Sequence, residues 1–336
     1  MKVLITGGAG YIGSTTATAL EAAGHVPVVL DSLVTGPRAF TRGRAFYEGE
    51  VGDRSLLRRV LTDHPDIEVV IHMAARIVVP ESVADPLLYY RDNVSQSIVL
   101  VDELTRLGVD RVVFSSSASV YAAPADGFEV REGDPVAPGS PYARTKLVVE
   151  SILADCAATS SLRSISLRYF NPIGADPAMR SGMYAAVPTH VLGQILLAAT
   201  GRTPAFTITG TDLPTRDGTG LRDYLHVWDL ALAHVAAVER FDDVLATTGG
   251  TSTLVNVGTG RGVTVRELLT AFEAVHGRPV PVRTGPPRPG DVVGAYANVD
   301  RAADLLGWRS RSTLEEAVET ALRWMQHRDR VVADQA

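Results

Sequence analysis

Hydrophobic and polar positions follow two different periods in the first half of the chain. Short apolar runs predict strands, and stretches with apolar residues three and four apart predict helices. The predicted strands are Lys2–Ile5, Val26–Leu30, Val69–His72, Val112–Ser115 and Ser164–Arg168, and the predicted helices are Gly13–Ala23, Ser55–Thr62, Val94–Leu107 and Pro141–Cys156. Apolar strands that alternate with helices are typical of βαβ units. We therefore expect a doubly wound α/β fold, with a parallel sheet covered by helices on both faces.

The second half of the chain has a less regular pattern. Helices are predicted at Pro188–Thr200, Val227–Glu239, Arg266–Val275 and Leu314–Gln326. Loops are predicted at Ala175–Met183 and Gly210–Gly220, which are rich in Gly, Pro and Asp, and a linker or surface loop at Asp242–Ser252. The proline-rich stretch Pro279–Pro289 cannot form a central strand throughout, because proline lacks the N–H that a strand ladder needs.

The composition is typical of a soluble globular protein. Apolar residues make up 46% of the 336 residues, and the net charge is −6 with both signs scattered along the chain. The sequence has neither a basic stripe nor an apolar run of ~18 residues, so we expect no nucleic-acid partner and no membrane span. One cysteine, Cys156, excludes an internal disulfide and a cysteine zinc cluster. The N-terminus does not resemble a signal peptide. Together these features predict a cytoplasmic protein without a metal site.

A glycine-rich turn follows the first predicted strand. The segment Gly7–Gly13, with the letters GGAGYIG, has the strand–turn–helix position of a dinucleotide-binding fingerprint. We expect Gly7 to permit the tight turn, Gly10 to let a pyrophosphate approach the backbone, and Gly13 to let the helix pack closely. The helix N-terminus would bind the phosphates. Asp31 ends the next predicted strand, where an acidic side chain binds an adenosine ribose and repels a 2′-phosphate, so a Rossmann-type domain that binds NAD is expected.

A tyrosine and a lysine lie four residues apart in the predicted helix Pro141–Cys156, and such a pair shares one helix face. An ammonium group beside a phenol lowers the pKa of the phenol, so Tyr142 next to Lys146 is a candidate general base. The serines of Ser115–Ser117 end a predicted strand, where the active sites of open α/β sheets lie. We expect these serines to hydrogen-bond a substrate hydroxyl and share its proton with Tyr142.

Several segments together resemble a known family. The glycine spacing with a later Tyr-x-x-x-Lys resembles the extended short-chain dehydrogenase/reductase superfamily. Arg168–Gly174 (RYFNPIG), Asp217–Val227 (DGTGLRDYLHV) and Arg288–Asp291 (RPGD) resemble the UDP-glucose 4-epimerases more specifically. This resemblance covers essentially the whole chain in matching order. It implies an isomerase of galactose metabolism, an NAD-dependent UDP-sugar 4-epimerase that inverts C4 through a transient 4-keto sugar.

The resemblance also implies which residues form the site. Tyr142 is the base, Ser117 assists it, and Lys146 binds the nicotinamide ribose. Arg222 and Arg288 bind the diphosphate, since guanidinium groups match phosphate oxygens. The other residues expected at the cofactor are Gly7, Gly10, Tyr11, Ile12, Gly13, Asp31, Ser32, Gly36, Glu50, Val51, Met73, Ala74, Ala75, Asn93, Ser115 and Tyr169. The other residues expected at the UDP-sugar are Asn171, Thr189, His190, Thr207 and Asp291.

The resemblance divides the chain into two domains and implies a homodimer. The NAD-binding Rossmann domain is expected at residues 1–174, with a returning segment near 222–258. A smaller α/β domain that binds the nucleotide sugar is expected at residues 175–221 and 259–336. The predicted helices Val94–Leu107 and Pro141–Cys156 are expected to pair with those of a second subunit in a four-helix bundle.

Some positions depart from the family pattern. Ile77 stands where relatives often have a lysine near the cofactor, and Arg76 beside it is expected to point elsewhere. Glu50 and Val51 stand where Asp followed by Ile or Val usually meets adenine, and the longer acid should still reach. His190 replaces part of an asparagine pair, so it either contacts the diphosphate or packs as an ordinary helix histidine.

Three alternatives remain open at this stage. A sugar-nucleotide 4,6-dehydratase needs an extra acid/base pair after the strand serines, where this chain has Ala118 and Ser119. A uronate decarboxylase is disfavoured by the RYFNP letters. A non-catalytic NAD-binding regulatory protein could keep the glycine turn, but it would not need the tyrosine, lysine and serine together. Within the epimerases, Ala295 occupies a position that gates the sugar pocket, and a small residue there predicts room for an N-acetylated or C6-oxidised sugar.

Overall fold

The computed structural model describes residues 1–124, 127–185, 188–286 and 293–333, and it confirms the predicted α/β fold class. Seven strands pair in parallel in the order β12-β7-β5-β4-β1-β2-β3. These strands are β1 (Lys2–Thr6), β2 (Val26–Asp31), β3 (Ala45–Glu48), β4 (Ile67–His72), β5 (Arg111–Ser115), β7 (Arg163–Tyr169) and β12 (Ser252–Val257). The chain runs outward from β1 to β3 and then returns to β4 on the other side of β1. A topological switch point therefore lies between β1 and β4, where open α/β sheets bind ligands.

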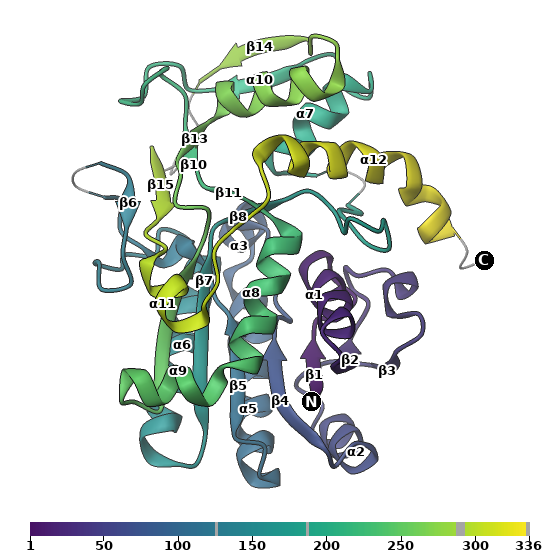
Figure 1. Cartoon of the computed structure of the whole chain (residues 1–336), viewed down its shortest axis with the longest axis vertical. Helices are drawn as coiled ribbons and strands as arrows, with labels where there is room; N and C mark the ends of the chain where they lie inside the picture. Colours follow the sequence, from purple (N-terminus) through teal and green to yellow (C-terminus); the bar gives the residue numbers. More distant parts are fainter. Residues whose placement is uncertain (125–126, 186–187, 287–292, 334–336) are drawn as a thin grey trace.

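Helices cover both faces of this sheet (Figure 1). One face packs against α1 (Tyr11–Ala22), α8 (Val227–Glu239), α9 (Phe241–Thr248) and α11 (Asp300–Leu306). The other face packs against α2 (Arg54–Asp63), α5 (Gln96–Leu107) and α6 (Pro141–Thr159). Successive residues of β1 alternate between the two cores, since Val3 and Ile5 belong to the first and Leu4 to the second. Strands buried on both faces explain the continuous apolar runs of the sequence.

A second lobe lies beyond the carboxyl ends of the strands, in the upper part of Figure 1. Its core is formed by α7 (Val191–Ala199), α10 (Val265–His276), α12 (Leu314–Ala333) and β9 (Phe206–Thr209), and β9 pairs with β14 (Val282–Gly285). The remaining short elements are α3 (Val79–Ala84), α4 (Pro86–Tyr89), β6 (Glu129–Val130), β8 (Asn171–Ile173), β10 (Leu221–Arg222), β11 (Tyr224–His226), β13 (Val263–Thr264) and β15 (Gly294–Ala297), with η1 (Arg38–Thr41), η2 (Tyr90–Ser95) and η3 (Ala118–Val120). The division into two domains at the stated boundaries stays a prediction.

The predicted linker at Asp242–Ser252 is wrong. Helix α9 begins at Phe241 and ends at Thr248, and Ser252 already begins strand β12. Phe241, Val244 and Leu245 are buried at helical spacing, so one face of this short helix packs into the first core. The helix ends because Gly249 adopts a left-handed conformation at φ 67°. Small residues on the solvent face concealed this apolar stripe.

In the part of the chain that the structure describes, we find no helix that combines the length and the hydrophobicity of a membrane span.

Candidate active site

The glycine turn between β1 and α1 has the geometry of a phosphate-binding loop. Gly7 has φ +75°, and a Cβ there would lie 2.7 Å from the backbone nitrogen of Ala74. A Cβ at Gly13 would lie 2.2 Å from the carbonyl oxygen of Gly7, so the helix packs as closely as the sequence predicts. Within the described helix α1, the N-cap Gly10 provides no side-chain cap, and the first turn contains no acidic residue. The first N–H groups of α1 are therefore available to an anion.

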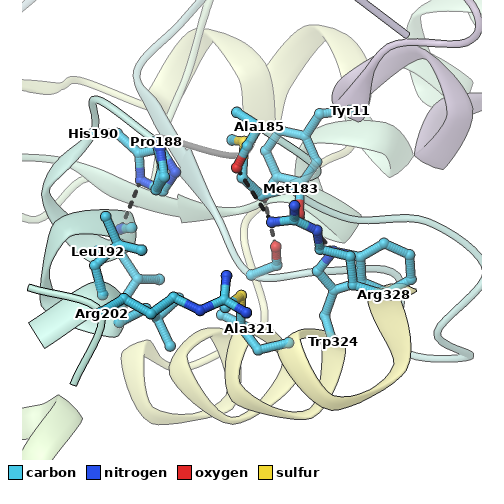
Figure 2. A pocket seen from close by; sticks show the side chains of 15 residues that line it. Tyr11, Met183, Ala185, Pro188, His190, Leu192, Arg202, Ala321, Trp324 and Arg328 are labelled. Atoms are coloured by element: carbon cyan, nitrogen blue, oxygen red, sulfur yellow. Dashed lines mark hydrogen bonds between the residues drawn. The ribbon is translucent and has the colours of Figure 1, made fainter. Parts of the chain in front are cut away.

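The side chain of Tyr11 leaves this loop and points toward the second lobe (Figure 2). Its phenol donates a hydrogen bond of 2.7 Å to the carbonyl of Gly174, and burial raises its pKa. Tyr11 can therefore serve the cofactor through its backbone, while Ile12 packs against the first core.

Asp31 lies at the carboxyl end of β2, where the sequence places an adenosine ribose. Its two oxygens accept hydrogen bonds from the backbone N–H groups of Ala9 (2.9 Å) and Leu33 (2.8 Å). Burial raises the pKa of Asp31, the two N–H groups oppose that rise, and the charge of Glu50 adds to it. Glu50 is exposed and Val51 buried. A Cβ at Gly36 would lie 2.5 Å from the Ala9 carbonyl oxygen, so the loop after β2 packs on the glycine turn at this glycine.

Asn93 holds the chain segment that follows β4. Its amide donates hydrogen bonds of 3.0 Å to the carbonyl of Arg76 and to the Thr145 hydroxyl, and it accepts one of 2.8 Å from the Arg76 N–H. The half-buried segment Met73–Ala75 is thereby fixed beside the glycine turn. The Arg76 side chain points elsewhere, as expected, because its Nε lies 2.5 Å from Asp92. Asn93 thus positions the backbone expected at the cofactor.

Tyr142 and Ser117 meet at the carboxyl end of β5. Both side chains are largely buried, and the Ser117 hydroxyl acts to lower the pKa of the phenol. The Ser117 Oγ accepts hydrogen bonds from the N–H of Ser119 at 3.2 Å and from its hydroxyl at 2.9 Å. Lys146, one turn further along α6, donates a hydrogen bond of 2.8 Å from Nζ to the carbonyl of Ser115 and lies 4.9 Å from the centre of the Phe114 ring. Burial lowers the pKa of Lys146 to about 7, and the charge of Glu150 opposes that change.

The expectation that the protein itself lowers the pKa of Tyr142 is wrong. Burial raises the pKa of Tyr142, and only the hydrogen bond from Ser117 acts in the other direction. The ammonium of Lys146 is directed to the Ser115 carbonyl instead of the phenol oxygen. Desolvation disfavours the phenolate more than the serine favours it. A working base at this position needs a further positive charge. Burial raises the pKa of Tyr169, and the charge of Tyr142 adds to that rise.

Ser115 contributes its carbonyl to Lys146 and its hydroxyl to a buried histidine. Its Oγ lies 2.8 Å from Nε2 of His234, whose Nδ1 lies 2.9 Å from the carbonyl of Leu230. Since a carbonyl accepts only, Nδ1 donates to it and Nε2 accepts from Ser115. Burial lowers the pKa of His234 from 6.5 to about 4. The histidine is therefore neutral at pH 7 and fixes the orientation of the serine.

Buried histidines predict a loss of stability in mild acid. Between pH 6.5 and about 4 the unfolded chain binds a proton at His234 that the folded chain excludes, so the free energy of unfolding falls as the pH falls. Burial also lowers the pKa of His190 to about 4. Urea unfolding at pH 7 and pH 5 should show this decrease, and His234→Gln should reduce it. His327→Gln, at an exposed position, should leave the decrease unchanged. Equal stability of the wild type at both pH values would contradict the prediction.

A buried ion pair that the sequence analysis missed joins the three elements of this site. Glu150 on α6 accepts two hydrogen bonds from Arg168 on β7, at 2.9 Å from Nε and 2.6 Å from Nη2. Glu150 also accepts a hydrogen bond from the Ser116 hydroxyl, which follows β5. The Arg168 guanidinium lies 4.9 Å from the centre of the Tyr121 ring. The sequence feature that could have pointed to Glu150 is its position four residues after Lys146, since residues four apart lie on the same face of a helix.

Two predicted substrate residues lie on short strands beyond the sheet. Asn171 on β8 stands opposite Tyr224 on β11, and Arg222 on β10 stands opposite Ala295 on β15. The phenol oxygen of Tyr224 is buried and has no hydrogen-bond partner among the described residues. A buried, unsatisfied hydroxyl beside these groups marks Tyr224 as a further candidate that the sequence analysis did not single out. The sequence feature that could have pointed to Tyr224 is its position two residues after Arg222 in the same motif.

The other predicted substrate residues are more dispersed. His190 caps α7, because its Nδ1 accepts a 3.1 Å hydrogen bond from the N–H of Gly193, and its Nε2 is buried without a partner in the described chain (Figure 2). Thr189 is exposed. Thr207 on β9 accepts a 2.8 Å hydrogen bond from Arg283. Arg288 and Asp291 lie outside the described residues, so their predicted roles stay predictions.

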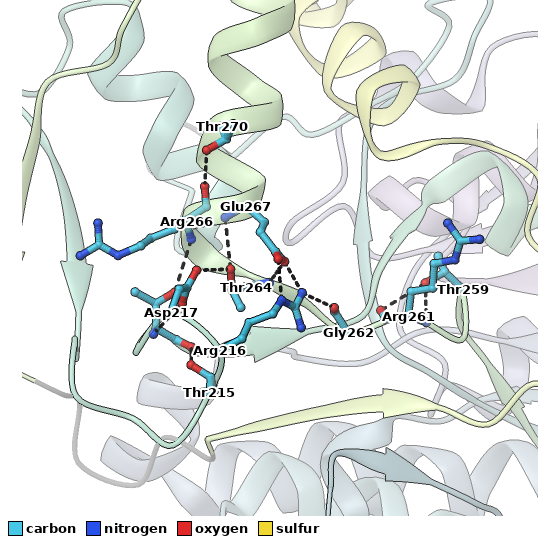
Figure 3. Close-up of polar contacts among 11 residues, drawn as sticks. Thr215, Arg216, Asp217, Thr259, Arg261, Gly262, Thr264, Arg266, Glu267 and Thr270 are labelled. Atoms are coloured by element: carbon cyan, nitrogen blue, oxygen red, sulfur yellow. Dashed lines mark hydrogen bonds and ion pairs between the residues drawn. The ribbon is translucent and has the colours of Figure 1, made fainter.

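The loop before Arg222 is fastened to the N-terminus of α10 (Figure 3). Asp217 accepts hydrogen bonds from the Thr219 hydroxyl at 2.7 Å and from the Thr264 hydroxyl at 2.5 Å. Arg216 forms two hydrogen bonds with Glu267, which also completes a capping box with Thr264. These contacts fix the start of β10 and therefore the position of Arg222.

Among the described residues, no group of three or more His, Cys, Asp or Glu side chains could hold a metal ion.

Comparison with known proteins gives consistent findings. The model of the NAD-dependent epimerase/dehydratase family matches residues 3–258. The UDP-glucose 4-epimerase of Azospirillum brasilense is 45% identical over 325 residues, which are 96% of this chain and 91% of that protein. The crystal structure of the Stenotrophomonas maltophila UDP-glucose 4-epimerase, with bound NAD and formylated UDP-arabinopyranose, has a TM-score of 0.92 at 38% identity and covers 98% of this chain and 99% of its own. The Brucella ovis UDP-glucose 4-epimerase in complex with NAD has a TM-score of 0.90 at 40% identity, with 96% and 98% covered.

Proposed function

This chain belongs to the NAD-dependent epimerase/dehydratase family, and we propose that it is an isomerase, an NAD-dependent UDP-sugar 4-epimerase. The observation that carries the proposal is the meeting of Tyr142 and Ser117 at the carboxyl end of β5, with Lys146 one turn further along the same helix. A base, a hydroxyl partner and an ammonium group at the edge of a dinucleotide-binding sheet suit proton transfer coupled to hydride transfer.

The residues of the chain fit the cofactor. The N–H groups of α1 suit the pyrophosphate, Asp31 suits the adenosine ribose, and Lys146 suits the nicotinamide ribose. When bound, NAD⁺ supplies the acceptor and then the donor of the C4 hydride, together with a positive charge near the Tyr142 phenol. That charge is what a buried phenol needs to act as a base near neutral pH.

The protein's own groups account for the rest of the reaction. Tyr142 takes the proton of the C4 hydroxyl and later returns it, and Ser117 hydrogen-bonds the same hydroxyl. Asn171 and Arg222 hold the diphosphate. Tight binding of the nucleotide and weak binding of the sugar let the sugar ring present either face to the site. The nucleotide thus supplies binding energy without fixing one orientation of the sugar.

The proposal is tested with purified protein and no added cofactor. UDP-glucose, UDP-N-acetylglucosamine and UDP-glucuronate are incubated separately, and the configuration at C4 of each product is determined by NMR. At least one substrate should be inverted at C4. Protein that carries NAD but inverts none of them would contradict the proposal. A 4-keto-6-deoxy product would favour the dehydratase alternative, although Ala118 and Ser119 lack the acid and base for that reaction.

We propose in addition that the sugar pocket accepts a bulky sugar. Ala295 stands opposite Arg222 and packs against the cluster that contains Val120 and Phe170. A tyrosine at this position would extend a much larger side chain against this cluster, to which Val120 of η3 belongs. Ala295→Tyr should lower the ratio of kcat/KM for UDP-N-acetylglucosamine over UDP-glucose about tenfold or more. Steady-state kinetics of both substrates measure this ratio, and strict UDP-glucose specificity of the wild type would contradict the prediction.

We also propose that the protein is a homodimer, that it is cytoplasmic and that it serves galactose metabolism. The outer faces of α5 and α6 carry exposed apolar side chains, including Ile98, Leu107 and Val148. Such a surface suits a helix–helix interface. Light scattering of the purified protein should give twice the chain mass, and Ile98→Glu should reduce it to the monomer mass. A monomeric wild type would contradict the dimer alone.

A further inference from the structure

A segment of the second lobe reaches the loop that follows β2. The ring of Tyr184 packs edge-on against Phe40, with ring centroids 5.7 Å apart, and the Thr35 side chain acts to lower the pKa of its phenol. Burial raises the pKa of Tyr184, and the charge of Asp31 adds to that rise. Phe40 belongs to the segment after β2, whose Gly36 lies against Ala9, so the ring of Tyr184 packs on the segment next to Asp31. Tyr184 therefore stands beside the adenosine end of the proposed cofactor site, although it lies more than 140 residues away in the sequence.

Helix α12 is hydrogen-bonded to the backbone of the segment Met183–Ala185 (Figure 2). Trp324 donates a hydrogen bond of 2.7 Å from Nε1 to the carbonyl of Met183, and Arg328 donates one of 3.2 Å to the carbonyl of Ala185. Trp324 is buried, and its ring centroid lies 5.8 Å from that of Phe40. The backbone is thus tied on both sides of Tyr184, and the same tryptophan contacts the loop that Tyr184 covers.

We propose that Tyr184, held by α12, closes the adenosine end of the cofactor site and slows the release of NAD. The cover consists of Met183–Ala185, Trp324 and Arg328. An adenosine bound at Asp31 would leave past the segment on which the Tyr184 ring packs, so this ring must move before the dinucleotide is released. Slow release suits an epimerase, which returns its cofactor to the starting oxidation state in each turnover. This inference rests on the proposed function, because it requires NAD in the site.

The test measures NAD release from purified holoenzyme. Free dinucleotide is removed by desalting, and the NAD that appears in the filtrate is quantified over time. Tyr184→Ala should release NAD about tenfold or more faster than the wild type. Tyr184→Phe keeps the ring on Phe40 and removes only the interaction of the phenol hydroxyl with Thr35, so it should accelerate release about fivefold. Tyr47→Phe is the matched control, because the Tyr47 phenol donates to Asp63 on the outer strand β3, and its release rate should equal that of the wild type.

Arg328→Gln provides an independent variant outside the loop. It removes the tether to the Ala185 carbonyl and should accelerate release in the same direction, even if Tyr184→Ala fails to fold. Wild-type release rates for Tyr184→Phe and Arg328→Gln would overturn the inference and leave the proposed function intact. A wild-type protein that carries no dinucleotide and takes none up would instead contradict the proposed function, and the inference with it.

Discussion

Tyr142→Phe is expected to lower kcat about 10³-fold while leaving bound NAD in place, since a positioned general base contributes roughly 10²–10⁴ in rate. The phenylalanine keeps the buried ring and removes only the hydroxyl that meets Ser117. Because that hydroxyl is the group that exchanges a proton with the sugar, substrate affinity should change little. Initial rates with the preferred UDP-sugar, together with the absorbance of bound NAD, measure both quantities.

The control for this variant is Tyr47→Phe, which also removes a phenol hydroxyl, at the opposite edge of the sheet. Its kcat should remain at the wild-type value. If Tyr142→Phe stays fully active, Tyr142 is not the base.

Glu150→Gln is expected to destabilise the fold by about 3–5 kcal/mol, because it leaves the buried Arg168 guanidinium without its counter-charge. The exposed fraction of both side chains is only about 5%, so water cannot replace the lost carboxylate. The same change frees Ser116 and weakens the support that Glu150 gives to the charge of Lys146. Urea denaturation measures the change in stability. The optimum of kcat against pH should also shift, because the pKa of Lys146 falls further once Glu150 is neutral.

Two variants separate this effect from an ordinary loss of charge. Asp66→Asn removes an exposed carboxylate that pairs with Lys2, and it should shift the unfolding midpoint far less. Glu150→Asp keeps the charge and should recover part of the stability. A Glu150→Gln protein as stable as the wild type, with the same pH profile, would show that the ion pair does not position the site.

The first half of the fold was predictable because its signals are local. The central strands of the large sheet are buried on both faces, and the apolar positions of the helices between them repeat every three to four residues, so the elements around β1 and α1 follow from the sequence within a few residues. Strand β3 was missed because it lies at the sheet edge and is only half-buried. Helix α9 was missed because it buries only a narrow stripe led by Phe241.

The residues of the candidate site also divide into those that local sequence signals predict and those that only the folded structure reveals. Tyr142, Lys146 and Ser117 were found because a motif and a strand end bring them together within one βα unit. Glu150 and His234 were not found, because their partners lie on other elements of the fold. Tyr224 was not found, because the burial of its unsatisfied hydroxyl is seen only in the folded chain. His234 lies on α8 and contacts Ser115, which is 119 residues earlier in the sequence. Only the packing of α8 against the sheet brings the two side chains together. The pKa of Tyr142 was misjudged for the same reason, since burial is a property of the whole fold.

In the proposed reaction, hydrogen leaves C4 of the sugar and returns to the same carbon. The decisive experiment runs the reaction in deuterium oxide without added cofactor and locates deuterium in the product by NMR. The product should be inverted at C4 and carry no deuterium on that carbon or on its neighbours C3 and C5. Deuterium bound to C4, or inversion at any other carbon, would contradict the proposed reaction.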